Sequence, residues 1–184
     1  ITPRMESVLE KTWFKRLRNW GQLADELDED LFLVGGCVRD ILLDRVTKDI
    51  DLVVEEDGIR FARALVKKSG GRISEHEKFR TAVVTLPDGD VVDIATARSE
   101  YYSHPAALPD VEIEHTSVLQ DLRRRDFTIN AMAVHLNPGH LGELMDLYGG
   151  RRDLDQGLVR ILYATSFYDD PTRMFRAIRF AARF

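Results

Sequence analysis

The spacing of apolar residues at the start of the chain predicts a helix. Between Met5 and Leu27, apolar side chains recur at intervals of three and four residues, which places them along one stripe of an amphipathic helix. Thr2 and Pro3 suit the N-cap and the first turn of this helix. We therefore expect a single N-terminal helix that packs against the rest of the fold.

Two short apolar runs follow, at 31–34 and 50–54, and each predicts a buried strand. Gly35 and Gly36 come directly after the first run, and a helical pattern at 37–43 follows them. This order predicts strand, glycine turn, helix and strand. Further along, the patterns predict helices at 59–68 and 117–124, strands at 72–77, 81–86, 91–95 and 144–147, a long polar connection at 98–109, an apolar strand within 124–134, and a last helix that opens at 169–173.

Two aspartates flank Ile50 where the second predicted strand begins. Residues two apart on a strand point to the same face, so Asp49 and Asp51 should project together. Adjacent carboxylates repel each other, and a hard cation such as Mg²⁺ with its preference for oxygen ligands would relieve the repulsion. The glycines before them would let backbone N–H groups approach phosphate at a helix start. Taken singly, however, D-x-D and Gly-Gly usually mark only a solvated strand end and a turn.

Three further polar positions have a structural and a functional interpretation. Asp93 lies between Val92 and Ile94, where a carboxylate is costly unless it is paired, bound to metal or on an exposed edge strand. Asp126 and Asn130 interrupt an apolar stretch and need partners. The hydroxyls of a ribose would satisfy both; alternatively, Asp126 pairs with Arg125 and Asn130 caps a turn.

Asp170 and Arg173 are three residues apart, so they share a face of the last predicted helix. The simpler interpretation is a capping acid in an ion pair worth a few tenths of a kcal/mol. The alternative is recognition of a base, in which the carboxylate accepts from an exocyclic amine and the guanidinium donates to a ring nitrogen or carbonyl. Such a pair would select cytosine and adenine over guanine and uracil.

Charge is distributed unevenly along the 184 residues, whose net charge is −5. Residues 1–115 carry 16 basic and 23 acidic side chains, whereas residues 116–184 carry 10 basic and 8 acidic ones. Every basic residue of the second part is arginine, whose rigid fork of donors suits phosphate. This composition favours contacts with a nucleotide or RNA over a merely solvated helix face.

Several other classes are disfavoured by the sequence. No apolar stretch approaches membrane-spanning length and no secretory signal is present, so we expect a cytoplasmic protein. Cys37 is the single cysteine, which rules out an internal disulfide. We interpret the five histidines as ordinary surface or packing residues and expect no zinc site. Because the chain begins at Ile1 and stops inside a helical pattern, we expect a domain of a longer protein.

Four stretches, in this order, resemble motifs of the class II tRNA nucleotidyltransferase and bacterial poly(A) polymerase family, within the polymerase-beta-like nucleotidyltransferase superfamily. They are GGCVRDILL with the following DID, then RRDFTINA, YGGRRDL and DDPTRMFRAIR, and VVDIATAR is similar to the segment that carries a third metal carboxylate. Two positions depart from the family pattern: Asp44 replaces a glycine and Asp169 replaces a glutamate. Asp44 tolerates a left-handed backbone, so the helix should still end there.

The resemblance implies an α+β fold. Residues 1–28 would form an N-terminal helix, 29–148 a mixed-sheet catalytic head, and 149–184 a hinge and the start of an all-α neck. The implied activity is template-independent addition of C and/or A from CTP and ATP to the tRNA 3′ end, with two Mg²⁺ ions and release of pyrophosphate. Poly(A) tailing, a small-molecule nucleotidyltransferase and a non-catalytic RNA-binding domain remain as alternatives.

The resemblance also implies roles for individual residues. These are metal binding and catalysis for Asp49, Asp51 and Asp93; phosphate binding for Gly35, Gly36 and Arg39; ribose contact for Arg125, Asp126 and Asn130; base reading for Asp170 and Arg173; and contact with phosphate or RNA backbone for Arg124, Arg176 and Arg179. For Arg39, a structural ion pair with Asp40 is the alternative.

Overall fold

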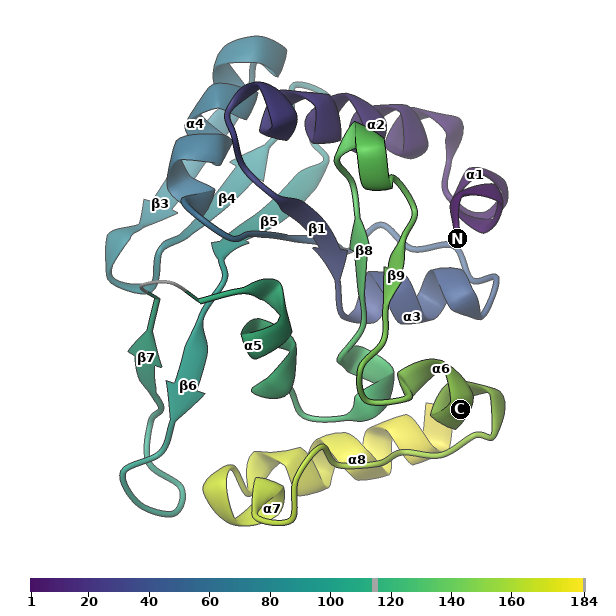
Figure 1. Cartoon of the computed structure of the whole chain (residues 1–184), viewed down its shortest axis with the longest axis vertical. Coiled ribbons are helices and arrows are strands. Elements are labelled where there is room, and N and C mark those ends of the chain that lie inside the picture. The colour runs from purple at the N-terminus through teal and green to yellow at the C-terminus, as the bar shows by residue number, and fades with distance from the viewer. Residues whose placement is uncertain (114–115, 184) are drawn as a thin grey trace.

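Strands from both halves of the chain form the main sheet of the computed structural model, which describes residues 1–113 and 116–183 (Figure 1). The strands in sheet order are β3 (Arg72–His76), β4 (Thr81–Thr85), β5 (Val91–Thr96), β2 (Ile50–Val54), β1 (Leu31–Val34), β8 (Ala133–His135) and β9 (Leu144–Met145). β2 and β5 run parallel, and the other neighbours run antiparallel. The predicted mixed α+β fold is confirmed.

Helices cover the sheet and extend beyond it (Figure 1). The described helices are α1 (Thr2–Val8), α2 (Lys11–Glu26), α3 (Gly36–Leu42), α4 (Gly58–Ser69), α5 (Val118–Arg123), α6 (Gly150–Asp155), α7 (Ser166–Asp169) and α8 (Thr172–Arg183), with 3₁₀ turns η1 (Glu77–Phe79), η2 (Thr128–Asn130) and η3 (Pro138–His140). In the described part of the chain, no helix is long and apolar enough to span a membrane.

The N-terminal segment is two helices, so the prediction of one continuous helix is wrong. Leu9 and Glu10 have extended backbones, with ψ of 142° and 141°, and separate α1 from α2. The Leu9 side chain is buried, so the break keeps the apolar stripes of both helices on the core. Thr2 lies within α1 rather than at its N-cap, and its hydroxyl donates to the carbonyl of Leu141 at 3.0 Å.

Two local predictions in the middle of the chain also need correction. The polar connection predicted at 98–109 begins with a strand, β6 (Ser99–Tyr101), which pairs with β7 (Asp110–Glu112) in a separate two-stranded sheet. The sequence places Ser117 inside the helix predicted at 117–124 and Thr116 at its cap, but α5 begins at Val118 and Ser117 is the cap, in a capping box with Gln120. By contrast, Asp44 adopts the expected left-handed backbone, with φ of 55°, directly after α3.

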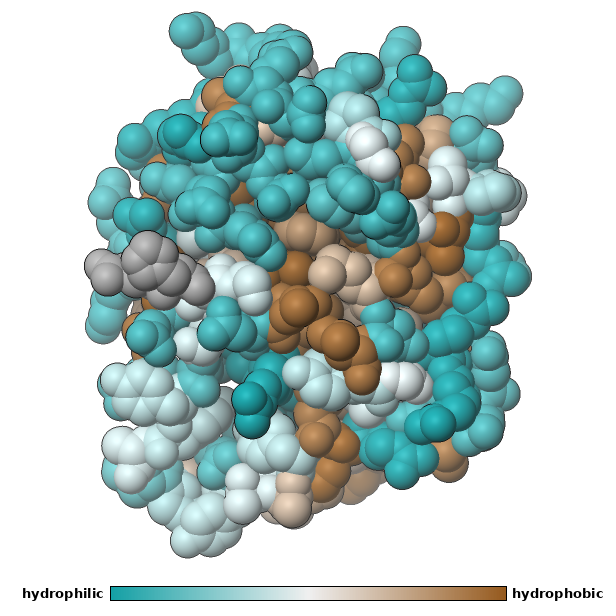
Figure 2. Space-filling model, in the orientation of Figure 1, coloured by the Kyte–Doolittle hydropathy of each residue, from teal (hydrophilic) through white to brown (hydrophobic). Residues whose placement is uncertain are grey.

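The final segment packs against the sheet-bearing part of the molecule. Phe180 of α8 meets Phe127 edge to face at 5.7 Å between ring centroids. The buried carboxylate of Asp153 on α6 accepts from the Thr128 hydroxyl at 2.7 Å and from Arg160 Nε at 2.9 Å. Polar residues cover most of the face seen in Figure 2, and apolar ones gather near its middle. Residues predicted to begin a neck are therefore tied to the head by both apolar and polar contacts.

Candidate active site

A cleft of about 420 Å³ brings together residues from five parts of the sequence. They come from α3 and the turn before it, the start of β2, the segment at β6, the segment from the end of α5 to η2, and α8 with the residue before its N-cap. Its lining is Gly35, Gly36, Arg39, Asp51, Glu100, Tyr102, Arg124, Arg125, Asp126, Asn130, Asp170, Arg173, Arg176 and Phe180. Most residues predicted to contact a nucleotide thus lie in one place. Arg179 is exposed on α8 and is not among the lining residues.

The aspartates lie at one side of this cleft. Asp51 on β2 is directly opposite Asp93 in the register of the parallel strand β5, so the two carboxylates share a face. β5 lies between β4 and β2 in the sheet, so the edge-strand interpretation of Asp93 is wrong. Asp49 lies one residue before β2 and is exposed. A second cavity of about 260 Å³ adjoins the cleft and is lined by both Asp51 and Asp93.

The electrostatic environment of Asp51 disfavours its ionised form. Burial raises the pKa of Asp51 above the ordinary carboxyl value, Arg125 lowers it, and the negative charges of Asp93 and Asp49 raise it further. The net pKa shift is upward, so the guanidinium does not fully compensate for burial and the neighbouring acids. An added cation would stabilise the ionised form.

This donor set fits Mg²⁺ by its chemistry, since all three candidate ligands are carboxylates and the ion prefers oxygen. Asp51 and Asp93 supply the shared face, and Asp49 lies close enough to influence Asp51. Among the described residues, the oxygens of these three acids are not grouped as a trio within 4.8 Å. Ion binding therefore would draw at least one of the side chains inward, for which the exposed Asp49 and Asp93 have room.

The sequence analysis did not single out Asp121, which holds two arginines at the cleft. Its carboxylate is fully buried and accepts from Arg124 Nη2 at 2.9 Å and from Arg125 Nη2 at 3.0 Å. Burial raises the pKa of Asp121, but the two guanidinium groups lower it further, so the net pKa is depressed. Glu100 also accepts from Arg124, at 3.0 Å. An Asp followed by Arg at i+3 and i+4 was the available sequence signal.

Gly35 is required by its backbone conformation, and it lies against Arg125. The backbone of Gly35 has φ of 70°, which side chains other than glycine rarely adopt. A Cβ at this position would lie 2.8 Å from Arg125 Nη1. Glycine thus allows the guanidinium to lie over the turn between β1 and α3, beside Asp51.

A series of hydrogen bonds links four of the residues that line the cleft, from Arg39 through Asn130 and Asp126 to Arg176. Arg39, which is 4% exposed, donates to Asp40 at 3.0 Å and to the Asn130 side-chain oxygen at 2.6 Å. The Asn130 amide donates to Asp126 at 3.0 Å, and Arg176 Nε donates to the other Asp126 oxygen at 2.7 Å. Asp126 therefore pairs with Arg176, not with Arg125 as the structural alternative held. The ion pair between Arg39 and Asp40 is present, as the alternative for that residue stated.

Arg173 is buried at the opposite side, with 4% of its surface exposed. It donates to the Ser166 hydroxyl at 2.6 Å, to the Tyr163 hydroxyl at 3.0 Å and to the Arg124 carbonyl at 3.0 Å. Its Nε also lies 3.6 Å from an Asp170 oxygen, the i,i+3 pair expected from the sequence. These contacts fix the guanidinium plane. A further hydrogen bond, to the Tyr102 hydroxyl at 3.4 Å, comes from the segment after β6.

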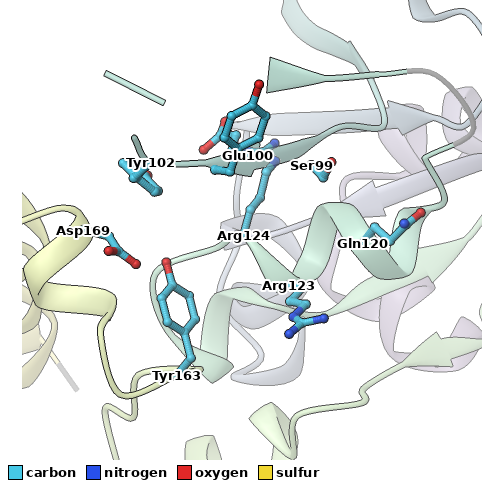
Figure 3. A pocket seen from close by; sticks show the side chains of 9 residues that line it. Ser99, Glu100, Tyr102, Gln120, Arg123, Arg124, Tyr163 and Asp169 are labelled. Carbon is cyan, nitrogen blue, oxygen red and sulfur yellow. The ribbon is translucent and has the colours of Figure 1, made fainter. Parts of the chain in front are cut away.

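A further pocket of about 480 Å³ continues from the cleft and shares Glu100, Tyr102 and Arg124 with it. Figure 3 shows Tyr163 and Asp169 on one side of this pocket and Glu100 and Tyr102 on the other. The cleft is thus open toward the hairpin of β6 and β7. A flexible polymer or a second substrate has space to approach from this direction.

A mixed sheet with paired carboxylates on two parallel strands, beside a cleft lined with arginines, defines a nucleotidyltransferase-type head. The family model described as the poly(A) polymerase head domain matches residues 31–160. The chain belongs to this family. The resemblance noted from the four motifs is confirmed.

Relatives and solved structures agree with this assignment. The chain is 50% identical over 167 residues to the A-adding tRNA nucleotidyltransferase of Geobacter sulfurreducens, covering 91% of this chain and 19% of that protein. It is 44% identical over 180 residues to the A-adding tRNA nucleotidyltransferase of Halalkalibacterium halodurans, covering 98% of this chain and 42% of that protein. The chain thus spans less than half the length of either relative.

Among solved structures, the apo form II of a CCA-adding enzyme superimposes with a TM-score of 0.94 at 43% identity, over 99% of this chain and 42% of that one. The Thermotoga maritima CCA-adding enzyme complexed with tRNA gives a TM-score of 0.88 at 41% identity, over 100% and 41% of the two chains. CCA-adding enzyme complexes with ATP and with CTP give TM-scores of 0.86 and 0.87, each at 41% identity, over 99% of this chain and 41% and 40% of theirs.

Proposed function

We propose that this protein adds C and/or A nucleotides from CTP or ATP to the 3′ end of tRNA and releases pyrophosphate. The observation that carries the proposal is the cleft that joins Asp51, which lies opposite Asp93 in the sheet, to the Asp170–Arg173 pair at the start of α8. The matched complexes with tRNA, ATP and CTP support the same substrates. Poly(A) tailing would use the same chemistry on another acceptor, and the names of the relatives favour tRNA.

Asp49, Asp51 and Asp93 would hold two Mg²⁺ ions, which lower the barrier to attack by a hydroxyl and stabilise the leaving pyrophosphate. The protein's own residues orient the nucleotide. The resemblance implied a ribose contact for Arg125, but its guanidinium lies beside Asp51 and over Gly35, so we propose that it contacts the phosphates instead. Asp121 already fixes the guanidinium of Arg125, so phosphate binding would not have to offset the entropy cost of ordering that side chain.

Asp126 and Asn130 lie in the middle of the series of hydrogen bonds that links Arg39 to Arg176, and we propose that they contact the ribose. Asp126 has one oxygen bonded to Asn130 and the other to Arg176. The carboxylate can accept further bonds from hydroxyl groups, and the amide of Asn130 can both donate to hydroxyl groups and accept from them. Arg39 donates to the Asn130 side-chain oxygen and fixes the orientation of that amide, so its effect on ribose binding would be indirect. Arg124 is occupied by Asp121 and Glu100, which favours a positioning role over direct contact with RNA.

Asp170 and Arg173 would read the base. Arg173 uses Nη1 and Nη2 on protein partners, and its Nε faces Asp170. A base inserted between the two side chains would exchange this 3.6 Å contact for bonds to its exocyclic amine and ring. Adenine and cytosine both offer the amine donor that a carboxylate accepts, whereas guanine and uracil offer a carbonyl at the corresponding place.

The experiment that tests the proposal follows incorporation of labelled ATP and CTP, with Mg²⁺, by the full-length natural protein. The acceptors are tRNAs that end at the discriminator base, at C and at CC. We expect addition to at least one of these ends, and none by a variant with Asp49→Ala and Asp51→Ala. CTP followed by ATP on the first acceptor indicates CCA addition, and ATP on the CC end alone indicates A addition. Equal signals from wild type and variant would contradict the proposal.

A further inference from the structure

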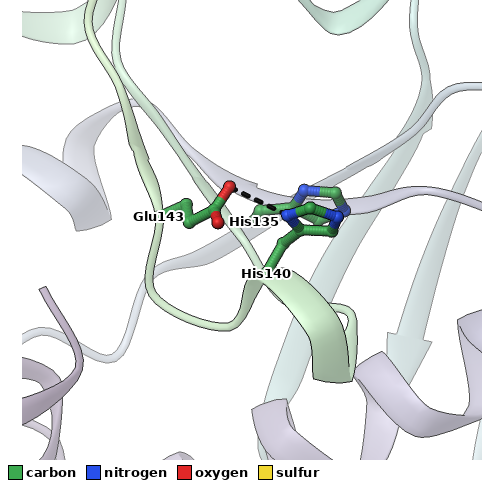
Figure 4. Close-up of side chains that lie close together, drawn as sticks. All are labelled: His135, His140 and Glu143. Carbon is green, nitrogen blue, oxygen red and sulfur yellow. Dashed lines mark hydrogen bonds and ion pairs between the residues drawn. The ribbon is translucent and has the colours of Figure 1, made fainter.

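Three potential metal ligands meet at the hairpin of β8 and β9. His135 is the last residue of β8, His140 ends η3, and Glu143 directly precedes β9. One ligand atom from each side chain lies within 4.8 Å of the other two, and in the described part of the chain no other three His, Cys, Asp or Glu residues do so. Figure 4 shows the two imidazoles one behind the other, with the carboxylate pointing at them. The sequence analysis expected no zinc site, although the spacing His-x₄-His was present, because Glu143 joins the two histidines only through the fold.

The distances within this group suit chelation. His140 Nδ1 and Glu143 Oε2 are 3.0 Å apart. Two ligands bound to one tetrahedral ion at ordinary Zn–N and Zn–O lengths lie about 3.3 Å apart. The rings of His135 and His140 are stacked, 5.0 Å between centroids and 9° between planes, so one ring must turn before an ion can lie in the plane of both. His140 and Glu143 are largely exposed, which leaves room for the His140 ring to turn.

The backbone that carries the three ligands is fixed before any ion binds. The His135 N–H donates to the Glu143 carbonyl at 3.0 Å, and the Glu143 N–H donates to the His140 carbonyl at 2.9 Å. Asn137 lies between His135 and His140 in the sequence, and its side chain is buried. This side chain accepts from the Leu31 N–H at 2.9 Å and donates to the Glu29 carbonyl at 2.8 Å. A preformed loop reduces the ordering cost that an ion would otherwise offset.

His135 also has the outer partner that metal-bound histidines usually have. Its Nε2 lies 3.1 Å from an oxygen of Asp30, and its ring packs on Phe32 at 4.5 Å between centroids. A carboxylate on the second ring nitrogen fixes the orientation of the ring and increases its basicity as a ligand. The Asp30 side chain is more than half exposed, so the group is open to ions from solvent.

We propose that His135, His140 and Glu143 form a binding site for a divalent transition-metal ion of the Zn²⁺ type. Two imidazoles and one carboxylate, with a fourth position open to water, match the ligands and ligand number that Zn²⁺ accepts. Imidazole nitrogen distinguishes this site from the all-carboxylate set at the cleft, which suits Mg²⁺. The two sites are at opposite ends of β1, since His135 pairs with Phe32 whereas Gly35 follows the other end.

The bound ion would link three points of the β8–β9 hairpin and stabilise it. Residues at the N-terminus also contact this hairpin, because the Thr2 hydroxyl donates to the Leu141 carbonyl and a Cβ on Gly142 would collide with Thr2. The site therefore stabilises the region where α1 joins the sheet. This role is independent of nucleotide transfer.

The test is a Zn²⁺ titration of the chelator-treated full-length protein against a chromophoric competitor, with millimolar Mg²⁺ present throughout. We compare wild type with His140→Ala, Glu143→Gln and Asp30→Asn, and we use His104→Ala as the matched control, because His104 is exposed and lies outside the group. The Asp51→Asn variant reports any Zn²⁺ bound at the cleft.

We expect affinity to fall at least about tenfold in His140→Ala and Glu143→Gln, and about 10- to 100-fold in Asp30→Asn. His104→Ala and Asp51→Asn should bind as wild type does. Zn²⁺ should raise the thermal midpoint of wild type and of His104→Ala, but not of His140→Ala, whose midpoint without metal should match that of wild type. Absence of Zn²⁺ binding to wild type, or equal affinity in wild type and His140→Ala, would overturn the proposal.

Discussion

Replacing Asp121 with Asn removes the buried charge that holds two arginines at the cleft. The carboxylate accepts three bonds from guanidinium groups, at 3.0 and 2.9 Å from Arg124 and at 3.0 Å from Arg125. Removing one partner of a buried ion pair costs about 3–5 kcal/mol. Asn keeps one acceptor and both arginines are 18% exposed, so they can regain some hydration. We therefore expect a loss near the lower limit, about 3 kcal/mol in the free energy of unfolding.

The pKa shift of Asp121 also predicts how the stability difference between wild type and Asp121→Asn changes with pH. The pKa of Asp121 is depressed in the folded protein below its ordinary value of 3.8. A depressed carboxyl pKa stabilises the fold above the unfolded-state value, and this stabilisation is lost as pH falls through the folded-state value. Urea unfolding at pH 7 should therefore separate wild type from Asp121→Asn, and the difference should shrink as the pH is lowered below about 4.

A matched control is Asp155→Asn, because Asp155 is an exposed acid 3.4 Å from Arg151 in an i,i+4 pair. Exposed pairs of this kind contribute about 0.3–0.5 kcal/mol. Asp121→Asn should also reduce nucleotide incorporation, since Arg125 would no longer be held over Gly35, whereas Asp155→Asn should not. If Asp121→Asn unfolds at the same urea concentration as Asp155→Asn at pH 7, the inferred role of the buried carboxylate is refuted.

Three other substitutions test the cleft. Asp51→Asn should abolish incorporation yet raise the thermal midpoint without metal, because burial and neighbouring acids raise the pKa of Asp51 and disfavour its charge; an unchanged or lower midpoint would contradict this. Gly35→Ala should cost about 1–3 kcal/mol in urea unfolding, since φ is 70° and Cβ meets Arg125; wild-type stability would refute the constraint. Arg173→Lys keeps the charge but loses the fork, so KM for ATP should rise while far-UV circular dichroism stays unchanged; an unaltered KM counts against base reading.

Much of the fold could be predicted from the spacing of apolar residues and from the glycines that end the elements. The strands at 31–34 and 50–54, the glycine turn and the helix after it were predicted because apolar runs and glycines act locally. Asp44 took the left-handed backbone expected at the end of that helix. Break points were harder to predict. The apolar stripe of the N-terminal segment continues through Leu9, so periodicity alone gave no sign that the backbone turns there.

For the candidate site, too, local features could be predicted from the sequence, whereas contacts between distant elements could not. Residue types and motif order predicted most of the residues that line the cleft but not Glu100, Tyr102 or Phe180, and the partners of the predicted residues depend on the tertiary fold. Arg176 approaches Asp126 from 50 residues away, and Glu100 reaches Arg124 from the separate hairpin. Glu143 joins two histidines only because η3 folds back before β9. Contacts between elements distant in sequence cannot be read from local patterns.

We propose that one cleft combines the chemistry of nucleotide transfer with the choice of base. The most direct measurement is kcat/KM of the full-length protein for ATP, CTP, GTP and UTP on tRNA ending at CC, for wild type and Asp170→Asn. Because Asp170 would read the exocyclic amine and does not belong to the aspartate set, the variant should retain incorporation but lose at least about tenfold of its preference for ATP and CTP over GTP and UTP. An unchanged preference in an active Asp170→Asn protein would contradict the account.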